Sequence, residues 1–150
     1  MKKKEKCIVF ILIIFLLLID QITKIIALKK WWIVKNSNNG SNGYYILISI
    51  IIIFMLFRYI LNNNTFIKLY TRIILSFGIS GGIGNLIDRI WNKNVILFIN
   101  LNNHIELNIS YIYILISWIG MAVIFTKDSV KFLQDKKIKR TDKNNENNSK

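Results

Sequence analysis

Charged and amide side chains lie at the ends of three long apolar blocks in this sequence, and they are the side chains that could do chemistry. Asp20 and Lys24 end the first block. Their i, i+4 spacing lets a carboxylate and an ammonium group pair on one face of a helix. Polar groups in or beside a membrane span are costly, so the pair suggests a function. The alternative is that this ion pair only marks the end of a membrane span and has no further role.

The second cluster is the densest and occupies the segment Ser80–Arg89. Its glycines let another helix or a ligand approach the backbone closely. Asn85 and Asp88 have an i, i+3 spacing, so they share one face of a helix, and Arg89 follows directly. Packing explains the glycines. It does not explain why three polar side chains gather beside them.

The third cluster is Glu106–Tyr111, where the last apolar block begins. Asn108 is a favourable N-cap residue, and it can cap this helix while its side chain still faces the other helices. A simple cap is the alternative. Because the three clusters are expected at the same depth in a membrane, we expect their polar side chains to converge on one groove. The residues expected there are Asp20, Lys24, Asn85, Asp88, Arg89 and Asn108.

Four apolar blocks must position these side chains. The chain has 150 residues, 53% of them hydrophobic, and a mean hydropathy of +0.38. Crossing a bilayer core takes about 20 helical residues. An open strand would leave its amide and carbonyl groups unpaired in hydrocarbon, and these blocks lack the alternation of barrel strands. The sequence therefore predicts membrane helices near residues 7–26, 44–61, 68–88 and 107–126.

The predicted fold is an all-α integral membrane protein, a four-transmembrane-helix bundle with two extracytoplasmic surface loops. The first loop, Ile25–Gly43, contains Trp31 and Trp32, which suit a membrane interface. The second loop, Ile90–Glu106, contains an apolar stretch at Val95–Ile99 that is too short to span. No small-x-small cleavage site follows the first block, so the first helix is expected to stay uncleaved.

The distribution of positive charge predicts the orientation, because lysine and arginine favour the cytoplasmic side. With the N-terminus inside, the cytoplasmic segments are 1–6, 58–72 and 127–150, and they carry 15 of the 21 lysines and arginines. Both termini are therefore expected on the cytoplasmic side of the plasma membrane.

The chain is expected to divide into a membrane domain, residues 1–126, and a basic tail, residues 127–150. The tail is rich in lysine and asparagine and has little apolar content, so we expect it to be disordered beyond about residue 135. Membrane topology and attraction to anionic lipid explain its charge. No nucleic-acid partner is predicted.

Two motifs in this four-helix frame resemble those of bacterial lipoprotein signal peptidase, also called signal peptidase II. They are the Asp-Gln-x-Thr-Lys block at Asp20–Lys24 and the more specific glycine block at Gly81–Arg89. The resemblance covers roughly residues 7–126. It implies an aspartic endopeptidase of the plasma membrane, which removes the signal peptide of a prolipoprotein just before a diacylglyceryl-modified cysteine. It implies no metal and no cofactor.

The chain departs from this family at the positions that matter most for catalysis. The family's loop motif Asn-x-Gly-x-Ala-Phe is matched only by Asn38 and Gly40, and Gly43 takes the place of its phenylalanine. The family's first catalytic aspartate lies nine residues after the aspartate of the Asp-Arg pair, and this position is Leu97. The second catalytic aspartate ends a Phe-Asn-x-Ala-Asp motif, and this position is Tyr111.

An aspartic peptidase uses two carboxylates that share one proton, one to activate water and the other to protonate the carbonyl oxygen. Leu97 cannot transfer protons, and the phenol of Tyr111 is a poor base at neutral pH. We therefore expect a catalytically impaired relative that still binds lipidated or membrane-inserted segments. Its expected partners are membrane lipid and lipidated prolipoprotein signal peptides.

Two alternatives remain open. The chain is an active lipoprotein signal peptidase if its catalytic groups lie elsewhere, for example in a relocated dyad of Asp88 and Glu106. It is an unrelated structural membrane protein if its glycines only pack against a partner. The residues expected to bind substrate or support the site are Asp20, Lys24, Asn38, Gly40, Asn85, Asp88, Arg89 and Asn108.

Overall fold

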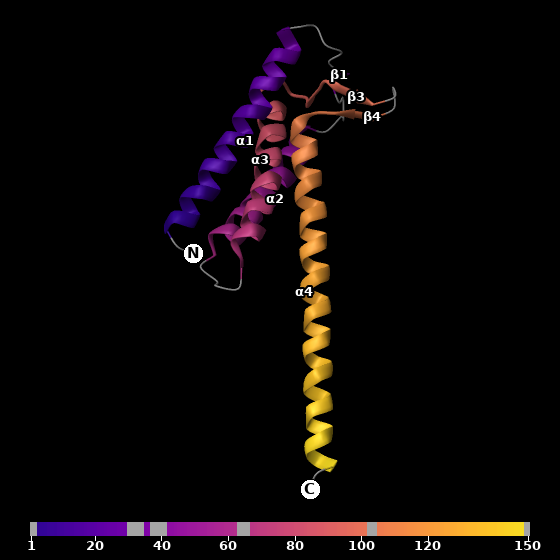
Figure 1. Cartoon of the computed structure of the whole chain (residues 1–150). Helices are drawn as coiled ribbons and strands as arrows, with labels where there is room; N and C mark the ends of the chain where they lie inside the picture. Colours follow the sequence, from indigo (N-terminus) through magenta and orange to yellow (C-terminus); the bar gives the residue numbers. More distant parts are fainter. Residues whose placement is uncertain (1–2, 30–34, 37–41, 63–66, 102–104, 149–150) are drawn as a thin grey trace.

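The computed structural model describes residues 3–29, 35–36, 42–62, 67–101 and 105–148. This part of the chain contains four long helices, with short strands at one end of the bundle (Figure 1). The helices are α1 (Lys3–Lys29), α2 (Asn42–Leu61), α3 (Leu69–Trp91) and α4 (Ile109–Asn148).

All four helices are long and apolar enough to cross a membrane, which confirms the predicted four-helix membrane fold. The segments are helical because every backbone group in hydrocarbon must be paired within its own segment. The start of α4 differs from the prediction, since Leu107 belongs to a strand and the helix begins at Ile109. The spans are Lys4–Lys29, Gly43–Leu61, Leu69–Trp91 and Ile109–Gln134.

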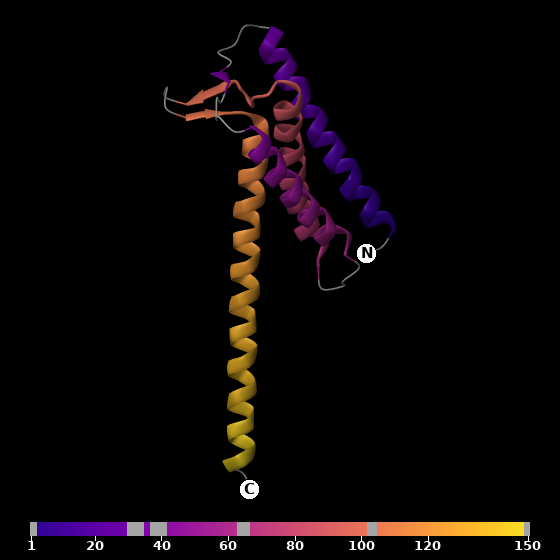
Figure 2. The same ribbon diagram turned by 180° about the vertical axis from the view of Figure 1, so that it is seen from behind.

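The central helix of the bundle is α3. It packs against α1, α2 and α4, whereas α1 has few contacts with α4. Figures 1 and 2 show this arrangement from opposite sides, with α3 lying between α1 and α4. In the apolar span of α3, 44% of the residues are buried, compared with 6% in α2. Polar side chains on α3 are therefore sheltered by the other helices.

Glycines on α3 allow its neighbours to approach closely, as small residues do at membrane helix interfaces. A Cβ atom on Gly81 would collide with the carbonyl oxygen of Ser110 in α4. A Cβ atom on Gly84 would collide with the carboxylate of Asp20 in α1 and with the hydroxyl of Ser110. The glycine block thus brings α1 and α4 against α3 at the level of the predicted polar groove.

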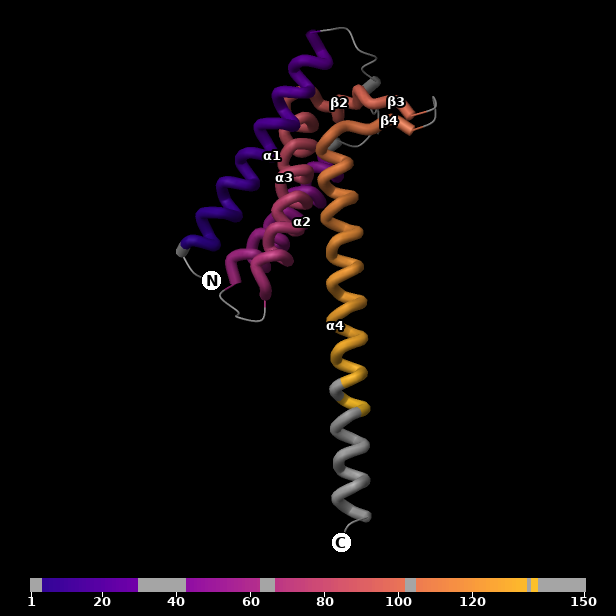
Figure 3. The backbone as a smooth tube through the Cα atoms, viewed as in Figure 1, coloured from indigo at the N-terminus to yellow at the C-terminus, as the bar shows by residue number. Residues whose placement is uncertain are grey.

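An apolar core fills the half of the bundle away from the strands. Its buried side chains come from α1, α2 and α3, and they are Val9, Ile13, Ile60, Leu75 and Ile79. Figure 3 shows that the start of α1, the end of α2 and the middle of α4 lie on this side. Large apolar side chains such as Phe54, Trp118 and Phe125 are exposed on the outside of the helices. This pattern is typical of a surface that faces lipid.

Short strands that the sequence did not predict lie at one end of the bundle, where one pair joins two loops and the other lies within a single loop. Strand β1 (Lys35–Asn36) pairs antiparallel with β2 (Ile96–Leu97), and β3 (Ile99–Leu101) pairs antiparallel with β4 (Ile105–Leu107). The apolar stretch that was expected on the membrane surface is therefore folded into strands, and Val95 is buried beside them. β-branched residues outside the helices, such as Ile96, Ile99 and Ile105, favour strands, and the pairing satisfies backbone groups of the paired residues.

Helix α4 continues to Asn148, where the sequence predicted a disordered tail beyond about residue 135. The sequence has no proline and no glycine after Gly120, so nothing in it terminates the helix. Lysine and glutamine are also good helix formers. The backbone shows no break at the expected boundary between residues 126 and 127, because one helix runs through it.

Candidate functional site

A buried ion cluster joins α1 to α3 near the strands. The ammonium nitrogen of Lys24 lies 2.7 Å from Oδ2 of Asp20 and 2.8 Å from Oδ2 of Asp88. None of the three residues is more than 1% exposed. The predicted i, i+4 pair of Asp20 and Lys24 is confirmed, and Lys24 also pairs with a second carboxylate, that of Asp88. Charges buried away from water are stabilised only when they are paired and hydrogen-bonded, as these are.

The carboxylate of Asp20 also holds the start of α4. Its Oδ1 accepts a hydrogen bond of 2.9 Å from the backbone amide of Ser110, in the first turn of that helix. Lys24 donates a hydrogen bond of 3.3 Å to the Ser110 hydroxyl. The first amides of a helix have no partner within the helix and carry the positive end of its dipole. A negative side chain there therefore stabilises α4 and fixes its position against α1.

An asparagine pair connects α3, α4 and β2. The side-chain nitrogen of Asn108 donates to Oδ1 of Asn85 and to the carbonyl oxygen of Ile96, both at 2.9 Å. Its side-chain oxygen accepts a hydrogen bond of 2.8 Å from the amide of Tyr111. This last contact is an N-cap, so Asn108 both caps α4 and faces the bundle, as predicted.

The backbone of Ile96 is held from both sides by this cluster. Its amide donates a hydrogen bond of 3.2 Å to Oδ2 of Asp88, and its carbonyl oxygen accepts from Asn108. The next residue along β2 is Leu97, which is 8% exposed. Asp88 of α3 and the cap residue of α4, Asn108, thus fix the backbone beside Leu97, and the cap made by Asn108 also fixes the backbone at Tyr111.

The structure brings five of the predicted residues together: Asp20, Lys24, Asn85, Asp88 and Asn108. We call these five residues the polar cluster. None of them is more than 2% exposed, so the predicted convergence is observed for these five residues, which form a compact buried network. The physical reason is that buried donors and acceptors must compensate one another, and the described buried side-chain nitrogen and oxygen atoms have hydrogen-bond partners.

Arg89 does not join the polar cluster. Its guanidinium carbon lies 5.9 Å from the ring centroid of Tyr45 in α2, and its Nη1 donates a hydrogen bond of 3.4 Å to the backbone oxygen of Asn85. The side chain is partly exposed at the edge of the bundle. Two other predicted residues, Asn38 and Gly40, lie outside the described residues.

Sequence reasoning missed Ser110 and Ile96. Ser110 is completely buried, and it stands where the family motif Phe-Asn-x-Ala-Asp has alanine. Its position two residues after the cap residue Asn108 was the only available signal. Ile96 contributes its backbone alone, and side-chain types in a sequence do not reveal such a role.

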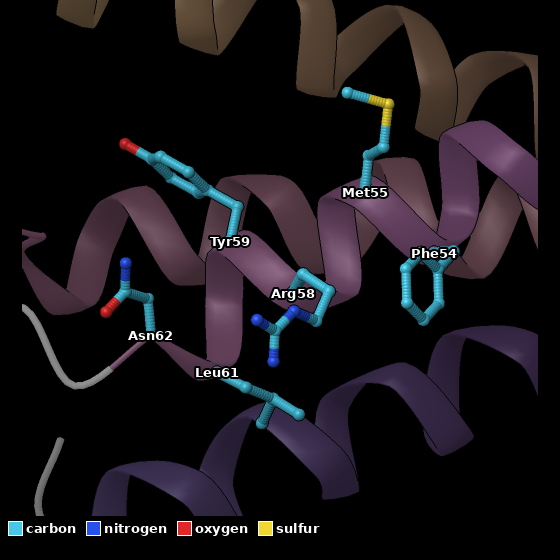
Figure 4. Close-up of a pocket in the computed structure, with 6 residues that line it drawn as sticks. All are labelled: Phe54, Met55, Arg58, Tyr59, Leu61 and Asn62. Atoms are coloured by element: carbon cyan, nitrogen blue, oxygen red, sulfur yellow. The ribbon is translucent and has the colours of Figure 1, made fainter.

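A hollow of about 630 Å³ lies far from the polar cluster. It is lined by Phe54, Met55, Arg58, Tyr59 and Leu61 of α2 and by Asn62, which directly follows that helix. Figure 4 shows these side chains spread along one helix and pointing in different directions. Side chains that do not converge cannot hold a reacting group in place, so this hollow is not a candidate for catalysis.

The family model described as "Signal peptidase (SPase) II" matches residues 31–127 of the chain. No curated protein matches the chain. Among solved structures, a bacterial membrane enzyme determined by the in meso method at 2.3 Å resolution has a TM-score of 0.72 and 21% sequence identity, over 81% of this chain and 88% of that one. A second bacterial membrane enzyme, determined by the same method at 1.9 Å resolution, has a TM-score of 0.70 and 23% identity, over 80% and 93%.

The two solved structures have the same fold as this chain. The family model extends from the first outer loop to the end of the apolar part of α4, and it includes Asn85, Asp88 and Asn108 of the polar cluster. Because that match covers more than half of the sequence, this chain belongs to the signal peptidase II family.

Proposed function

We propose that this protein is a catalytically impaired member of the signal peptidase II family, which binds lipidated or membrane-inserted segments without hydrolysing them. One observation carries the proposal. The residues at the two positions of the family's catalytic aspartates are Leu97 and Tyr111, while the backbone at both positions is held by a complete hydrogen-bond network. The supporting frame is retained and the two carboxylates are absent.

The loss of both carboxylates removes the proton transfers that hydrolysis of a peptide bond requires. Each such transfer commonly contributes about 10²–10⁴-fold to a rate. Asp88 cannot form a relocated dyad with Glu106, because both Lys24 and the amide of Ile96 already bind its Oδ2. Asp20 is likewise bound to Lys24 and to the amide of Ser110.

The proposal places the protein in the bacterial plasma membrane with both termini in the cytoplasm. The excess of lysine and arginine in segments 1–6, 58–72 and 127–150 supports this orientation. The strands and the polar cluster then lie on the outer side. Reporter fusions at Asn39 and after Lys127 test the orientation, and labelling of Asn39 from the cytoplasm would contradict it.

An active peptidase is the second candidate, and one contact favours it. The Ser110 hydroxyl accepts a hydrogen bond from Lys24, and a serine beside a lysine is a known nucleophile and base. Lys24 is the donor in its contact with Ser110 and also binds two carboxylates, so it is not placed to accept the serine proton. Ser110 is also completely buried, so a substrate cannot reach it. The geometry therefore favours the impaired protein.

Turnover of a lipidated prolipoprotein peptide by the purified protein in nanodiscs separates the candidates. We expect no cleavage above background by the natural chain. The double variant Leu97→Asp/Tyr111→Asp is expected to cleave, because it returns both carboxylates to a supported backbone. A matched control is Leu101→Asp/Ile105→Asp, which adds the same charges at two exposed positions of the β3–β4 pair and is expected to remain inactive. Cleavage by the natural chain that is lost in Ser110→Ala would establish a serine peptidase.

Binding is measured separately with a fluorescent lipidated peptide titrated against the inactive natural chain. We expect saturable binding that an excess of unlabelled lipidated peptide displaces. A peptide of the same sequence without the diacylglyceryl group and without its apolar segment should not compete. Equal competition by both peptides would contradict the proposed recognition of lipidated, membrane-inserted segments.

A further inference from the structure

A hollow between α3 and α4 lies at the end of the bundle opposite to the polar cluster. It measures about 510 Å³ and is lined by Tyr70 and Ile74 of α3 and by Gly120, Val123, Ile124 and Lys127 of α4. Gly120 deepens it, because a Cβ atom there would lie only 2.7 Å from Cγ2 of Ile74. The floor of the hollow is therefore apolar.

One end of this hollow is polar and positively charged. The side chain of Lys127 is exposed at the rim, and Tyr70 is 44% exposed. The ammonium nitrogen of Lys68 lies 5.5 Å from the ring centroid of Tyr70, so a second positive charge is close to the same end. Lys127 and Tyr70 thus line a hollow whose remaining lining is Ile74, Gly120, Val123 and Ile124, and Lys68 lies next to that lining, against the ring of Tyr70.

The positions of the two lysines along their helices place them at one boundary of the hydrocarbon. Lys68 immediately precedes the apolar span of α3, which begins at Leu69. Lys127 lies within the α4 span, Ile109–Gln134, and it is the first charged residue after an uncharged run from Leu107 to Thr126, so the apolar part of that span ends there. The rim therefore lies at the depth of lipid head groups, and the apolar floor lies at the depth of acyl chains.

We propose that this hollow is a binding site for one anionic phospholipid, independent of the binding of lipidated segments at the other end of the molecule. The phosphate of the head group is bound between Lys68, Lys127 and the hydroxyl of Tyr70, and an acyl chain covers Ile74 and Gly120. Basic pockets between membrane helices bind anionic head groups in this way. The positive rim matches the head group of a phospholipid, and the apolar floor matches its acyl chains.

Native mass spectrometry of the full chain in detergent tests the site with phosphatidylglycerol, phosphatidylcholine and glycerol phosphate as probes. We expect one phosphatidylglycerol to be retained in preference to phosphatidylcholine, and no retention of glycerol phosphate, which has the phosphate but no acyl chains. The double variant Lys68→Gln/Lys127→Gln is expected to weaken retention of phosphatidylglycerol by roughly tenfold, since each lysine contributes to the attraction.

The matched control is Lys4→Gln/Lys136→Gln, which removes the same charge from exposed lysines of α1 and α4. It is expected to retain phosphatidylglycerol like the natural chain, and an equal loss in both double variants would overturn the proposal in favour of diffuse attraction. Equal retention of glycerol phosphate would also overturn it, because acyl chains would then be irrelevant.

A third variant, Val123→Trp, fills the apolar part of the hollow from a half-exposed position. It is expected to reduce retention of phosphatidylglycerol although both lysines are intact. Unchanged retention would contradict binding of an acyl chain in the hollow.

Discussion

The ammonium group of Lys24 lies 2.8 Å from the carboxylate of Asp88, and both side chains are almost completely buried. This contact joins α1 to α3. The same lysine is bound to Asp20, which in turn binds the first turn of α4. A single positive charge therefore links the three helices that meet at the polar cluster.

Replacing Lys24 by methionine is expected to lower the free energy of unfolding by about 3–5 kcal/mol, because it leaves two buried carboxylates without a positive partner. Thermal unfolding followed by tryptophan fluorescence in detergent measures the loss. Lys29→Met is the control, since this exposed lysine lies on the same helix, and it should change the melting temperature little. Adding Asp88→Asn to Lys24→Met should recover part of the loss. A double variant less stable than the single one would contradict the role of charge pairing.

Substitution of Gly84 by alanine is expected to destabilise the bundle, although alanine is the better helix former. The new Cβ atom would collide with the carboxylate of Asp20 and the hydroxyl of Ser110, so α1 and α4 must move apart. Overpacking of this kind costs about 1–3 kcal/mol. Gly43→Ala is the matched control, because nothing lies within 4 Å of a Cβ atom there. If both variants unfold at the temperature of the natural chain, the close approach at Gly84 is not required.

The variant Asn108→Ala is expected to loosen β2 and the start of α4 together. It removes an N-cap, worth about 0.5–2 kcal/mol, and it frees the carbonyl oxygen of Ile96. Hydrogen exchange should accelerate at the amides of Leu97 and Tyr111, while the amides of α2 keep their protection. Thr126→Ala, which removes a hydroxyl from an exposed position of the same helix, should leave exchange at both sites unchanged. Uniform acceleration across the chain would indicate global destabilisation in place of local release.

Arg72 is expected to be essential for the connection between α2 and α3. The side chain is 1% exposed and donates hydrogen bonds to the backbone oxygens of Ile60, Asn62 and Ile67. A hydrogen bond from a charged group contributes about 1.5–3 kcal/mol. Arg72→Met should therefore lower the melting temperature clearly, whereas Arg58→Met, on the exposed face of α2, should not. Equal melting temperatures for the two variants would show that this arginine is dispensable.

Much of the architecture could be predicted from the sequence, because membranes restrict the choices of a chain. Apolar blocks of sufficient length must be helices in hydrocarbon. The sequence therefore predicted most ends of the four spans to within a few residues. Local spacing likewise predicted that Asp20 pairs with Lys24 and that Asn108 caps α4. Each of these features depends on residues that are neighbours along one helix.

Other features depend on segments that are far apart in the sequence, and the sequence did not reveal these features. The pairing of β1 with β2 joins two different loops, and each strand is too short to give a signal of its own. Arg89 follows Asp88 directly, yet the turn of the helix directs it to the edge of the bundle.

The sequence by itself determined which polar residues the chain would have to shelter, since charges and amides at the ends of apolar spans are too costly to face lipid. Only the tertiary structure decided how they are sheltered. Lys24 receives its second carboxylate from α3, and Ile96 is held by side chains of α3 and α4, because the glycines of α3 bring three helices into contact at one level. Once those helices meet, the polar residues form hydrogen bonds with one another. These contacts between helices cannot be predicted from the spacing of residues along a single helix.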